Sequence, residues 1–451
     1  MVFTLKDILR LQVAPALGYT EPVAVALAAA AAASLMDERP FESIEVWVDP
    51  NIYKNGMAVT IPGSNNLAGL DKAAALGAFG GDPNLGLEVL ESLTEQTLDQ
   101  VVKFCLDPSV PIHLLEHVQD LCVRVCITAC GRQAEAEIRD FHDQIVRLTL
   151  DGKDIETHPL LFNVLQNKEP DRASVEEWIK GLTLDELLGL VDQLDDEDRK
   201  FLKEGVDLNM RLADHGLKYG PGPGLGIGRA FERLIRQNLI CQDMVLAARI
   251  LASAAADARM AGVNLPAMSS AGSGNQGLTA VLPIWAVKDY VTASEDVVIE
   301  ALALSHMITA YIKAYTGRLS AICGCSVAAG AGAAAGVAYL LGGTTLHIAG
   351  AITNLIEDLA GVICDGAKPG CALKLATAAG TAVHSALFAL QGVRVQATDG
   401  IAGVSPEKTM QNIGTLSREG MIETDRTILK IMIEKNLPKN SDHGQARDHL
   451  K

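Results

Sequence analysis

The second half of the chain contains a long stretch, from Gly262 to Gly403, that is dominated by alanine and glycine. Alanine favours helices, and small side chains let helices pack closely, so this stretch predicts a tightly packed helical core. Aromatic residues make up only 4% of the 451 residues although 49% are hydrophobic, so aliphatic side chains must fill that core. This composition excludes a disordered chain, and the length predicts two or three domains.

The charge of the chain narrows the choice of partners. The 38 Lys and Arg residues against 55 Asp and Glu residues give a net charge of −17. A nucleic-acid-binding protein needs a basic face, so we expect no nucleic-acid partner. Two apolar runs, Val23–Met36 and Val327–Gly343, are rich in barely hydrophobic Ala and Gly. A bilayer span needs about 20 strongly apolar residues, so we expect buried helices and no membrane association.

The N-terminus and the cysteines indicate a compartment. Lys6, Asp7 and Arg10 are scattered, and the first long apolar run begins only at Val23, which is not the pattern of a signal peptide. The nine cysteines are odd in number, which argues against a disulfide framework. We therefore expect a reduced, cytoplasmic protein.

Hydrophobic periodicity divides the chain into two parts. Ser43–Pro50 alternates as a strand, Met57–Gly63 reads as a second strand after a Lys-Asn-Gly turn, and Leu121–Cys130 opens a β-meander. Beyond a polar linker the patterns are almost entirely helical. We predict an α+β fold, with a small mixed α/β domain (residues 1–165) followed by a mainly helical domain rich in Ala and Gly (residues 166–451).

Two glycine-rich loops are candidate binding sites. Gly220–Leu234 contains Gly-x-Gly-x-Gly, but a dinucleotide site requires a preceding strand, so we interpret it as a helix–helix loop. Ser269–Gly277 precedes an apolar helix, and its small residues let backbone N–H groups converge on an anion. No lysine follows, which favours a carboxylate over a polyphosphate. An ordinary interhelical loop is the alternative.

Four cysteines gather near glycine turns, at Cys323 and Cys325 and at Cys364 and Cys371. Their spacing is not that of a zinc ribbon or a ferredoxin, and buried free cysteines are the alternative. Lys368 makes the second loop cationic, which favours thiolates and a soft-metal site. An iron–sulfur cube held by three cysteines leaves one iron free to polarise a leaving group, which suits elimination chemistry.

Six longer motifs carry a family resemblance: GYTEPVAVALAAA, VDPNIYKNGMAVTIPG, ASAAADARMAG, LPAMSSAGSGNQGLTAVLPI, LALSHMITAYIKAYTGRLSAICG and GVICDGAKPGCALK. Together they resemble the bacterial and archaeal L-cysteine desulfidase family, which is related to the α-domain of iron–sulfur L-serine dehydratases. The resemblance spans the chain from about Leu5 to Lys435.

This resemblance implies an oxygen-sensitive [4Fe-4S] cluster and β-elimination of L-cysteine to sulfide, ammonia and pyruvate through an aminoacrylate. It implies Cys323, Cys364 and Cys371 as cluster ligands, with Cys325 as the alternative to Cys323. The implied partner is a small amino-acid substrate, and the sequence is compatible with a homo-oligomer without defining the oligomeric state. The implied substrate-binding residues are Asn55, Ser273, Gly274, Asn275 and Gln276, and the implied catalytic residues are Tyr19, Lys54 and His306.

One position departs from the family pattern. The family has Gly-Cys-Thr-Glu-Pro where this chain has Gly18-Tyr19-Thr20-Glu21-Pro22, and that cysteine is implicated in catalysis. Tyrosine, with a reference pKa of about 10, is a poorer base than a thiolate at neutral pH. An L-serine dehydratase-like activity, another hydroxy- or amino-acid substrate, or a non-catalytic ligand- or metal-binding role are therefore alternatives.

Three further residues have either a structural role or a role in the site. His306 lies in an apolar helix, where a core histidine is the usual explanation. Asp257 and Arg259 are two residues apart and do not face each other on a helix. We expect each of them to pair with another segment, either in a structural ion pair or in the site.

Overall fold

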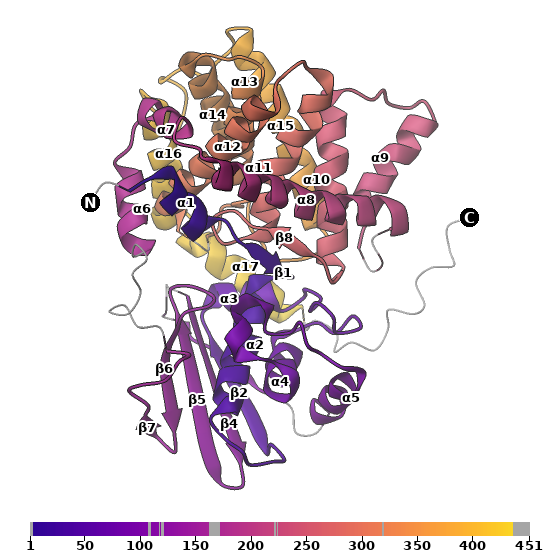
Figure 1. Ribbon diagram of the computed structural model, residues 1–451, viewed down its shortest axis with the longest axis vertical. Helices are drawn as coiled ribbons and strands as arrows, with labels where there is room; N and C mark the ends of the chain where they lie inside the picture. The colour runs from indigo at the N-terminus through magenta and orange to yellow at the C-terminus, as the bar shows by residue number, and fades with distance from the viewer. Residues whose placement is uncertain are drawn as a thin grey trace.

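The computed structural model describes residues 3–106, 110–116, 118, 121–161, 172–220, 222, 224–317 and 320–435. A six-stranded sheet with helices on one face forms the lower part of Figure 1, and a helical bundle forms the upper part. The predicted α+β class is confirmed. The predicted boundary at residue 165 lies outside the described residues, so the division into those two domains stays a prediction.

The sheet has the strand order β3-β2-β4-β5-β6-β7. Strands β4, β5 and β6 form the predicted antiparallel meander, and β2 pairs antiparallel with β4 and parallel with β3. The inward residues Val46 and Val125 are partners across the β2–β4 ladder, so one face is apolar. The strands are β2 (Ser43–Val48), β3 (Ile112–Leu114), β4 (Cys122–Ala129), β5 (Arg132–Arg139), β6 (Ile145–Leu150) and β7 (Lys153–Asp154).

Helix α2 (Thr20–Ser34) packs on the apolar face of this sheet and against α4 (Leu70–Gly80). Gly77 of α4 lies so close to the carbonyl of Ala26 in α2 that a Cβ atom at position 77 would clash with it. Small residues therefore set the distance between the two helices, as the alanine-rich sequence predicts. The outer elements on this side are η1 (Pro83–Glu88) and α5 (Glu95–Phe104).

The predicted strand at Met57–Gly63 is wrong. The residues before this segment form helix α3 (Pro50–Gly56), and the segment itself contributes an isolated bridge from Thr60 to Ala68. Asp49 caps this helix by accepting hydrogen bonds from the N–H groups of Asn51 and Ile52, at 2.8 and 3.2 Å. Proline at the first helical position completes a strong start signal, which moves Lys54 and Asn55 from a turn into a buried helix.

The upper part is a bundle around α10, α11, α12, α13 and α15. Helices α12 and α15 are long and apolar enough to cross a membrane by length and composition, but most of each apolar window is buried inside the protein. The helices are α6 (Arg172–Lys180), α7 (Leu184–Val191), α8 (Asp196–Tyr219), α9 (Ile227–Arg236), α10 (Met244–Met260), α11 (Gly274–Val287), η2 (Lys288–Tyr290), α12 (Glu295–Thr316), α13 (Ala328–Leu340), α14 (Thr345–Leu359), α15 (Cys371–Leu390), α16 (Pro406–Thr415) and η3 (Leu416–Gly420).

The two ends of the described chain connect the parts. Helix α1 (Leu5–Gln12) packs against α12, and strand β1 (Pro15–Leu17) pairs antiparallel with β8 (Pro266–Met268), so the chain begins in the helical bundle and then enters α2. At the other end, α17 (Ile422–Glu434) contacts α3. In Figure 1, α17 lies between the bundle and the sheet.

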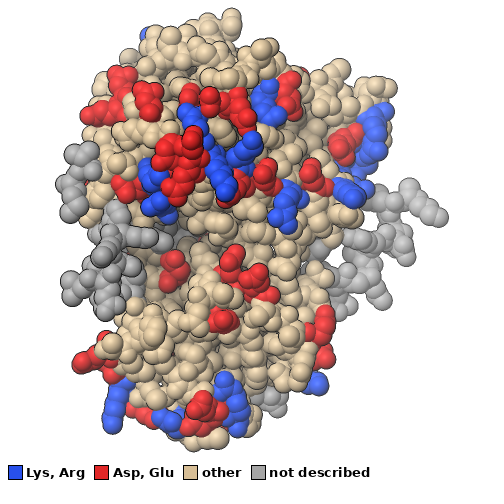
Figure 2. Space-filling view, viewed as in Figure 1, with Lys and Arg blue, Asp and Glu red and all other residues tan. Residues whose placement is uncertain are grey.

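Charged side chains of both signs are interspersed on the face shown in Figure 2. Several form ion pairs between helices of the bundle: Lys6 lies 2.5 Å from Asp195, and Arg199 lies 2.9 Å from Asp296. On this face the basic side chains are broken up by acidic ones, which agrees with the net charge of −17.

Candidate functional site

The β1–β8 ribbon brings Tyr19 beside the Ser269–Gly277 loop. Ser269 donates from its N–H to the Ala14 carbonyl at 2.8 Å, and the Ala14 N–H donates to Ser269 Oγ at 3.2 Å. Gly18 then turns the chain with φ +68°, against the ring of Pro62, where a side chain would not fit. Residues that are about 250 apart in sequence thus become neighbours.

Arg259 of α10 holds these segments together. Its Nη1 donates to Asn275 Oδ1 at 2.9 Å, its Nη2 donates to the Gly18 carbonyl, and its Cζ lies 4.9 Å from the centre of the Tyr19 ring. Arg259 is only 3% exposed. Such a buried guanidinium connects the start of α2 to the start of α11, and it places a positive charge against an aromatic face.

The loop itself is a tight turn before α11. Ser270 and Ser273 exchange backbone hydrogen bonds of 3.1 Å, and Ala271 and Gly272 between them have φ of +46° and +79°. The backbone N–H groups of Gly274, Asn275 and Gln276 have no acceptor in the described part of the chain. Unpaired donors at a helix N-terminus provide the anion-binding geometry that the loop composition predicts.

His306, on α12, supports this loop. Its Nδ1 lies 2.9 Å from Ser270 Oγ, and the side chain is buried. Burial lowers the pKa of His306 to about 4, so the imidazole is neutral at pH 7. The residue is therefore a buried histidine that contacts the candidate site.

Asn55 and Glu21 form a second buried pair close to Tyr19. Asn55 Nδ2 donates to Glu21 Oε1 at 2.9 Å, and the hydroxyl of Thr20 donates to Glu21 Oε2 at 3.2 Å. Burial raises the pKa of the Glu21 carboxyl. Burial also raises the pKa of Tyr19, and the nearby Cys371 and Glu21 raise it further, so Tyr19 is a neutral phenol.

Lys54 is placed between α17 and the second cysteine loop. Its Nζ lies 2.5 Å from Asp425 Oδ1 while its side chain is only 2% exposed. Its backbone carbonyl lies against Gly366, where a Cβ atom would clash. The backbone of Lys54 thus contacts the second cysteine loop, and its ammonium group forms an ion pair with Asp425 of α17.

The two cysteine segments lie side by side. Ile322 and Ile363 form an antiparallel bridge, the N–H of Cys323 donates to the Val362 carbonyl at 2.9 Å, and the N–H of Cys364 donates to the Ala321 carbonyl at 2.6 Å. Cys371 is the first residue of α15. A Cβ atom at Gly324 would lie 3.1 Å from Gln276 Nε2, so this region also borders α11.

The cysteine thiols differ in how readily they lose a proton. Cys325 donates a hydrogen bond to Cys323, which lowers the pKa of Cys323 to about 5 and raises that of Cys325. Burial raises the pKa of Cys371 to about 11. Lys374 lies 2.5 Å from Asp365 and adds positive charge near Cys323 and Cys371. The two thiols of the first cysteine turn thus interact directly, and either of them can supply its thiolate.

The donor chemistry of this region fits an iron–sulfur cluster. In the described ranges, no three His, Cys, Asp or Glu side chains converge closely enough to hold a single metal ion. A zinc ion would hold its sulfur ligands at about 2.3 Å. In a cube each thiolate binds a separate iron, so its sulfurs stand farther apart. Thiols on two facing turns, with a lysine nearby, are donors of the kind that such a cluster takes.

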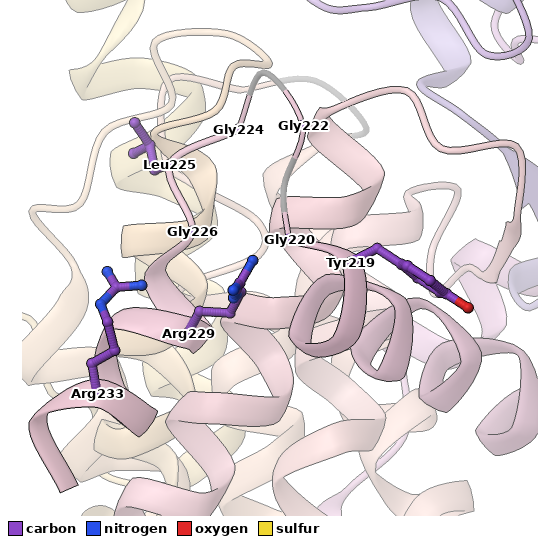
Figure 3. Close-up of a pocket in the computed structure, with 8 residues that line it drawn as sticks. All are labelled: Tyr219, Gly220, Gly222, Gly224, Leu225, Gly226, Arg229 and Arg233. Atoms are coloured by element: carbon purple, nitrogen blue, oxygen red, sulfur yellow. The ribbon is translucent and has the colours of Figure 1, made fainter. Parts of the chain in front are cut away.

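The other glycine-rich loop connects α8 and α9, as expected for a helix–helix loop. Asp257 accepts hydrogen bonds from the N–H groups of Gly226 and Gly228, at 3.0 and 3.2 Å, so the described start of α9 already carries a carboxylate. A pocket of about 370 Å³ lies beside it, and none of the predicted site residues lines it. Figure 3 shows Arg229 and Arg233 reaching from α9 toward its loop, and the lining comprises Tyr219, Gly220, Gly222, Gly224, Leu225, Gly226, Arg229 and Arg233.

The structure adds three residues to the candidate site. Glu21 and Asp425 were not singled out by the sequence, and Arg259 stood there between a structural pair and a site role. The sequence did contain a signal for Glu21 and Arg259. Both are charged residues in apolar helices, as Asp257 is, and such residues require a partner. Asp257 does pair with another segment, as expected.

Comparison with known proteins identifies related chains. Residues 84–430 match the family model described as the serine dehydratase alpha chain. A UPF0597 protein of Desulfatibacillum aliphaticivorans is 61% identical over 436 residues, which cover 96% of this chain and 99% of its own. UPF0597 proteins of Clostridioides difficile and Geobacter sulfurreducens are 43% and 38% identical, with 95% of this chain covered and 99% and 98% of theirs.

Proposed function

Because the chain belongs to the serine dehydratase alpha-chain family, we propose that it is an iron–sulfur lyase that eliminates sulfide from L-cysteine. The observation that carries the proposal is the bridge between Ile322 and Ile363, which sets two cysteine turns side by side next to the start of α11. A candidate anion site and a candidate cluster site therefore share one buried region. A small amino acid could span both.

Cys323, Cys364 and Cys371 would hold a [4Fe-4S] cluster, and Cys325 would keep Cys323 in its thiolate form through a hydrogen bond. When bound, such a cluster supplies a Lewis acid that polarises the leaving group. Because Cys371 has a raised pKa, its proton must leave when the metal binds.

The three candidate catalytic residues would contribute in different ways. Tyr19 is a neutral phenol and can donate its O–H proton to the departing sulfur. His306 is neutral at pH 7, and in the tautomer whose Nδ1 donates to Ser270 its Nε2 carries a lone pair that would accept the Cα proton. Lys54 pairs with Asp425 through its ammonium group and would act by positioning, because its backbone carbonyl lies against Gly366 of the second cysteine loop.

In this reaction the Cα–H and Cβ–S bonds of L-cysteine break, which yields hydrogen sulfide and 2-aminoacrylate. The aminoacrylate isomerises to an imine, and water hydrolyses the imine to pyruvate and ammonia. Loss of water from L-serine follows the same bond changes, with oxygen in place of sulfur. The phenol at position 19, where the resembled family has cysteine, favours this second substrate as the alternative, because a phenol can also protonate a departing hydroxide.

The test is a pyruvate assay under anaerobic conditions with L-cysteine and L-serine as substrates. We expect pyruvate from at least one of them. Tyr19→Phe, which keeps the ring and removes the proton, should lower kcat by about 100-fold or more. Tyr19→Cys should shift the preference toward L-cysteine. An anaerobic, iron-loaded protein that forms pyruvate from neither amino acid would leave a non-catalytic binding protein as the explanation.

A further inference from the structure

Three buried polar atoms in the region of Arg259, Glu21 and the start of α11 have no hydrogen-bond partner in the described chain: Arg259 Nε, Gln276 Oε1 and Asn55 Oδ1. The three side chains are 3%, 5% and 4% exposed, so bulk water does not satisfy these atoms. Buried polar groups are nearly always hydrogen-bonded, so unpaired ones indicate a missing partner. One of the three is a donor, and the other two are acceptors.

The unpaired donor lies against the start of α11. A Cβ atom on Gly274 would lie 2.5 Å from Arg259 Nε and 2.7 Å from its Cζ, so the guanidinium covers the first residue of the helix. The backbone N–H groups that begin α11 also have no acceptor among the described residues. The buried donor and the helix N-terminus thus form one region that lacks an acceptor.

Arg259 is also a buried charge that makes no ion pair with any carboxylate of the described residues. Both of its hydrogen bonds go to uncharged oxygens, Asn275 Oδ1 and the Gly18 carbonyl. Buried charges are generally paired, because an isolated ion is costly to remove from water. A ligand carboxylate would supply both the negative charge and the missing acceptor.

The two unpaired acceptors each lack a donor. Asn55 gives its amide N–H to Glu21, so its Oδ1 is left without a partner. The Gln276 amide faces Gly324, between the two cysteines of the first cysteine turn. An ammonium group has three N–H donors and no acceptor, which suits two carbonyl oxygens.

We propose that Arg259 Nε and the start of α11 bind the carboxylate of a free α-amino acid, and that Gln276 Oε1 and Asn55 Oδ1 bind its ammonium. The inference rests on the proposed function, because it assigns the two ends of the same substrate. It makes Arg259 a binding residue and selects zwitterions over hydroxy acids and over simple amines.

The first experiment measures equilibrium binding by calorimetry to the full-length protein, prepared anaerobically with its cluster. The probes are L-alanine, which has both charges and no leaving group, L-lactate, which lacks the ammonium, and ethylamine, which lacks the carboxylate. We expect L-alanine to bind at least about tenfold more tightly than either of the others. Equal affinity for L-alanine and L-lactate, or for L-alanine and ethylamine, would overturn the proposal.

The second experiment separates the two ends of the ligand. Arg259→Gln should weaken L-alanine and L-lactate alike, by about 10- to 100-fold, because both carry the carboxylate. Gln276→Met should weaken L-alanine alone and so reduce the preference over L-lactate. Arg233→Gln, an exposed arginine on α9, is the control for Arg259→Gln and should change neither affinity. Wild-type affinity in a folded Arg259→Gln protein would contradict the role of Arg259.

If Arg259→Gln does not fold, Arg259→Lys replaces it, because lysine keeps the charge and removes the Nε donor. The comparison of the three probes with the wild-type protein needs no variant and still tests the proposal. Failure of this inference is distinguishable from failure of the proposed function. Arg259-dependent binding of L-alanine without pyruvate formation keeps the binding site and removes the lyase. Pyruvate formation with an unchanged KM in Arg259→Gln keeps the lyase and removes the binding site.

Discussion

The guanidinium of Arg259 lies directly over Gly274, so close that a methyl group at position 274 would come within 2.5 Å of Nε. The same guanidinium donates to the carbonyl of Gly18. One side chain on α10 therefore fixes the distance between the start of α2 and the start of α11. Only glycine at position 274 leaves room for this arrangement.

Gly274→Ala tests that relationship. The added methyl group must displace the guanidinium or the start of α11, so we expect kcat/KM for the substrate to fall about tenfold or more. Gly189→Ala is a matched control, because Gly189 lies within helix α7 and a Cβ atom there would meet no neighbour. It should keep full activity and raise stability by about 0.5–1 kcal/mol. Full activity in Gly274→Ala would contradict the packing described here.

The ion pair between Lys54 and Asp425 should stabilise the contact between α3 and α17. Asp425→Asn leaves a lysine that is 2% exposed without its counter-charge. We expect a loss of about 3 kcal/mol in the free energy of unfolding, measured by urea denaturation. Glu423→Gln changes an exposed ion pair on the same helix and should cost less than about 1 kcal/mol. Equal losses in the two variants would show that burial of Lys54 has no energetic weight.

His306 should make the protein sensitive to acid. Its pKa falls from about 6.5 in the unfolded chain to about 4 in the folded protein, so the unfolded state binds the proton more tightly. Stability is therefore complete above about pH 6.5 and is lost as the pH falls toward 4, by about 3 kcal/mol.

Urea denaturation at several pH values tests this effect of His306. His306→Gln should flatten the dependence of the free energy of unfolding on pH between about 6.5 and 4. His384→Gln, at an exposed position on α15, should leave it unchanged. An unaltered slope in His306→Gln would mean that other groups cause the acid sensitivity.

The assignment of the cysteine ligands has its own spectroscopic test. Cys364→Ala and Cys371→Ala should each abolish the brown chromophore of the anaerobic protein, whereas Cys325→Ala should retain it. Cys241→Ala is the control, because Cys241 is exposed and far from the cysteine turns in sequence. A protein that loses its chromophore with Cys325→Ala and keeps it with Cys323→Ala would exchange the roles of these two residues.

Local signals in the sequence predicted most of the fold. The alternating pattern at Leu121–Cys130 predicted the meander, and the alternation at Ser43–Pro50 predicted β2. The Lys-Asn-Gly turn and the strand at Met57–Gly63 were predicted wrongly: Asp49 and Pro50 start a helix that runs through the expected turn, and the residues after it contribute an isolated bridge at Thr60. Local patterns predict best where local hydrogen bonds form the element.

The arrangement of the site required tertiary contacts. The β1–β8 pairing joins two three-residue strands from opposite halves of the chain, and such short strands have no periodicity to detect. The partner of Lys54 lies on the last described helix, and no spacing in the sequence relates the two. The sequence could identify Arg259 as a charge that needs a partner. It could not predict that Nε of Arg259 lies against the first residue of α11.

The measurement that tests the central claim most directly is the iron, acid-labile sulfide and zinc content of the wild-type protein purified without oxygen, followed by a pyruvate assay on the same sample. The account predicts about four iron and four sulfide per chain, a brown colour, and pyruvate from L-cysteine or L-serine. Zinc in place of iron, together with no pyruvate from either amino acid, would contradict it.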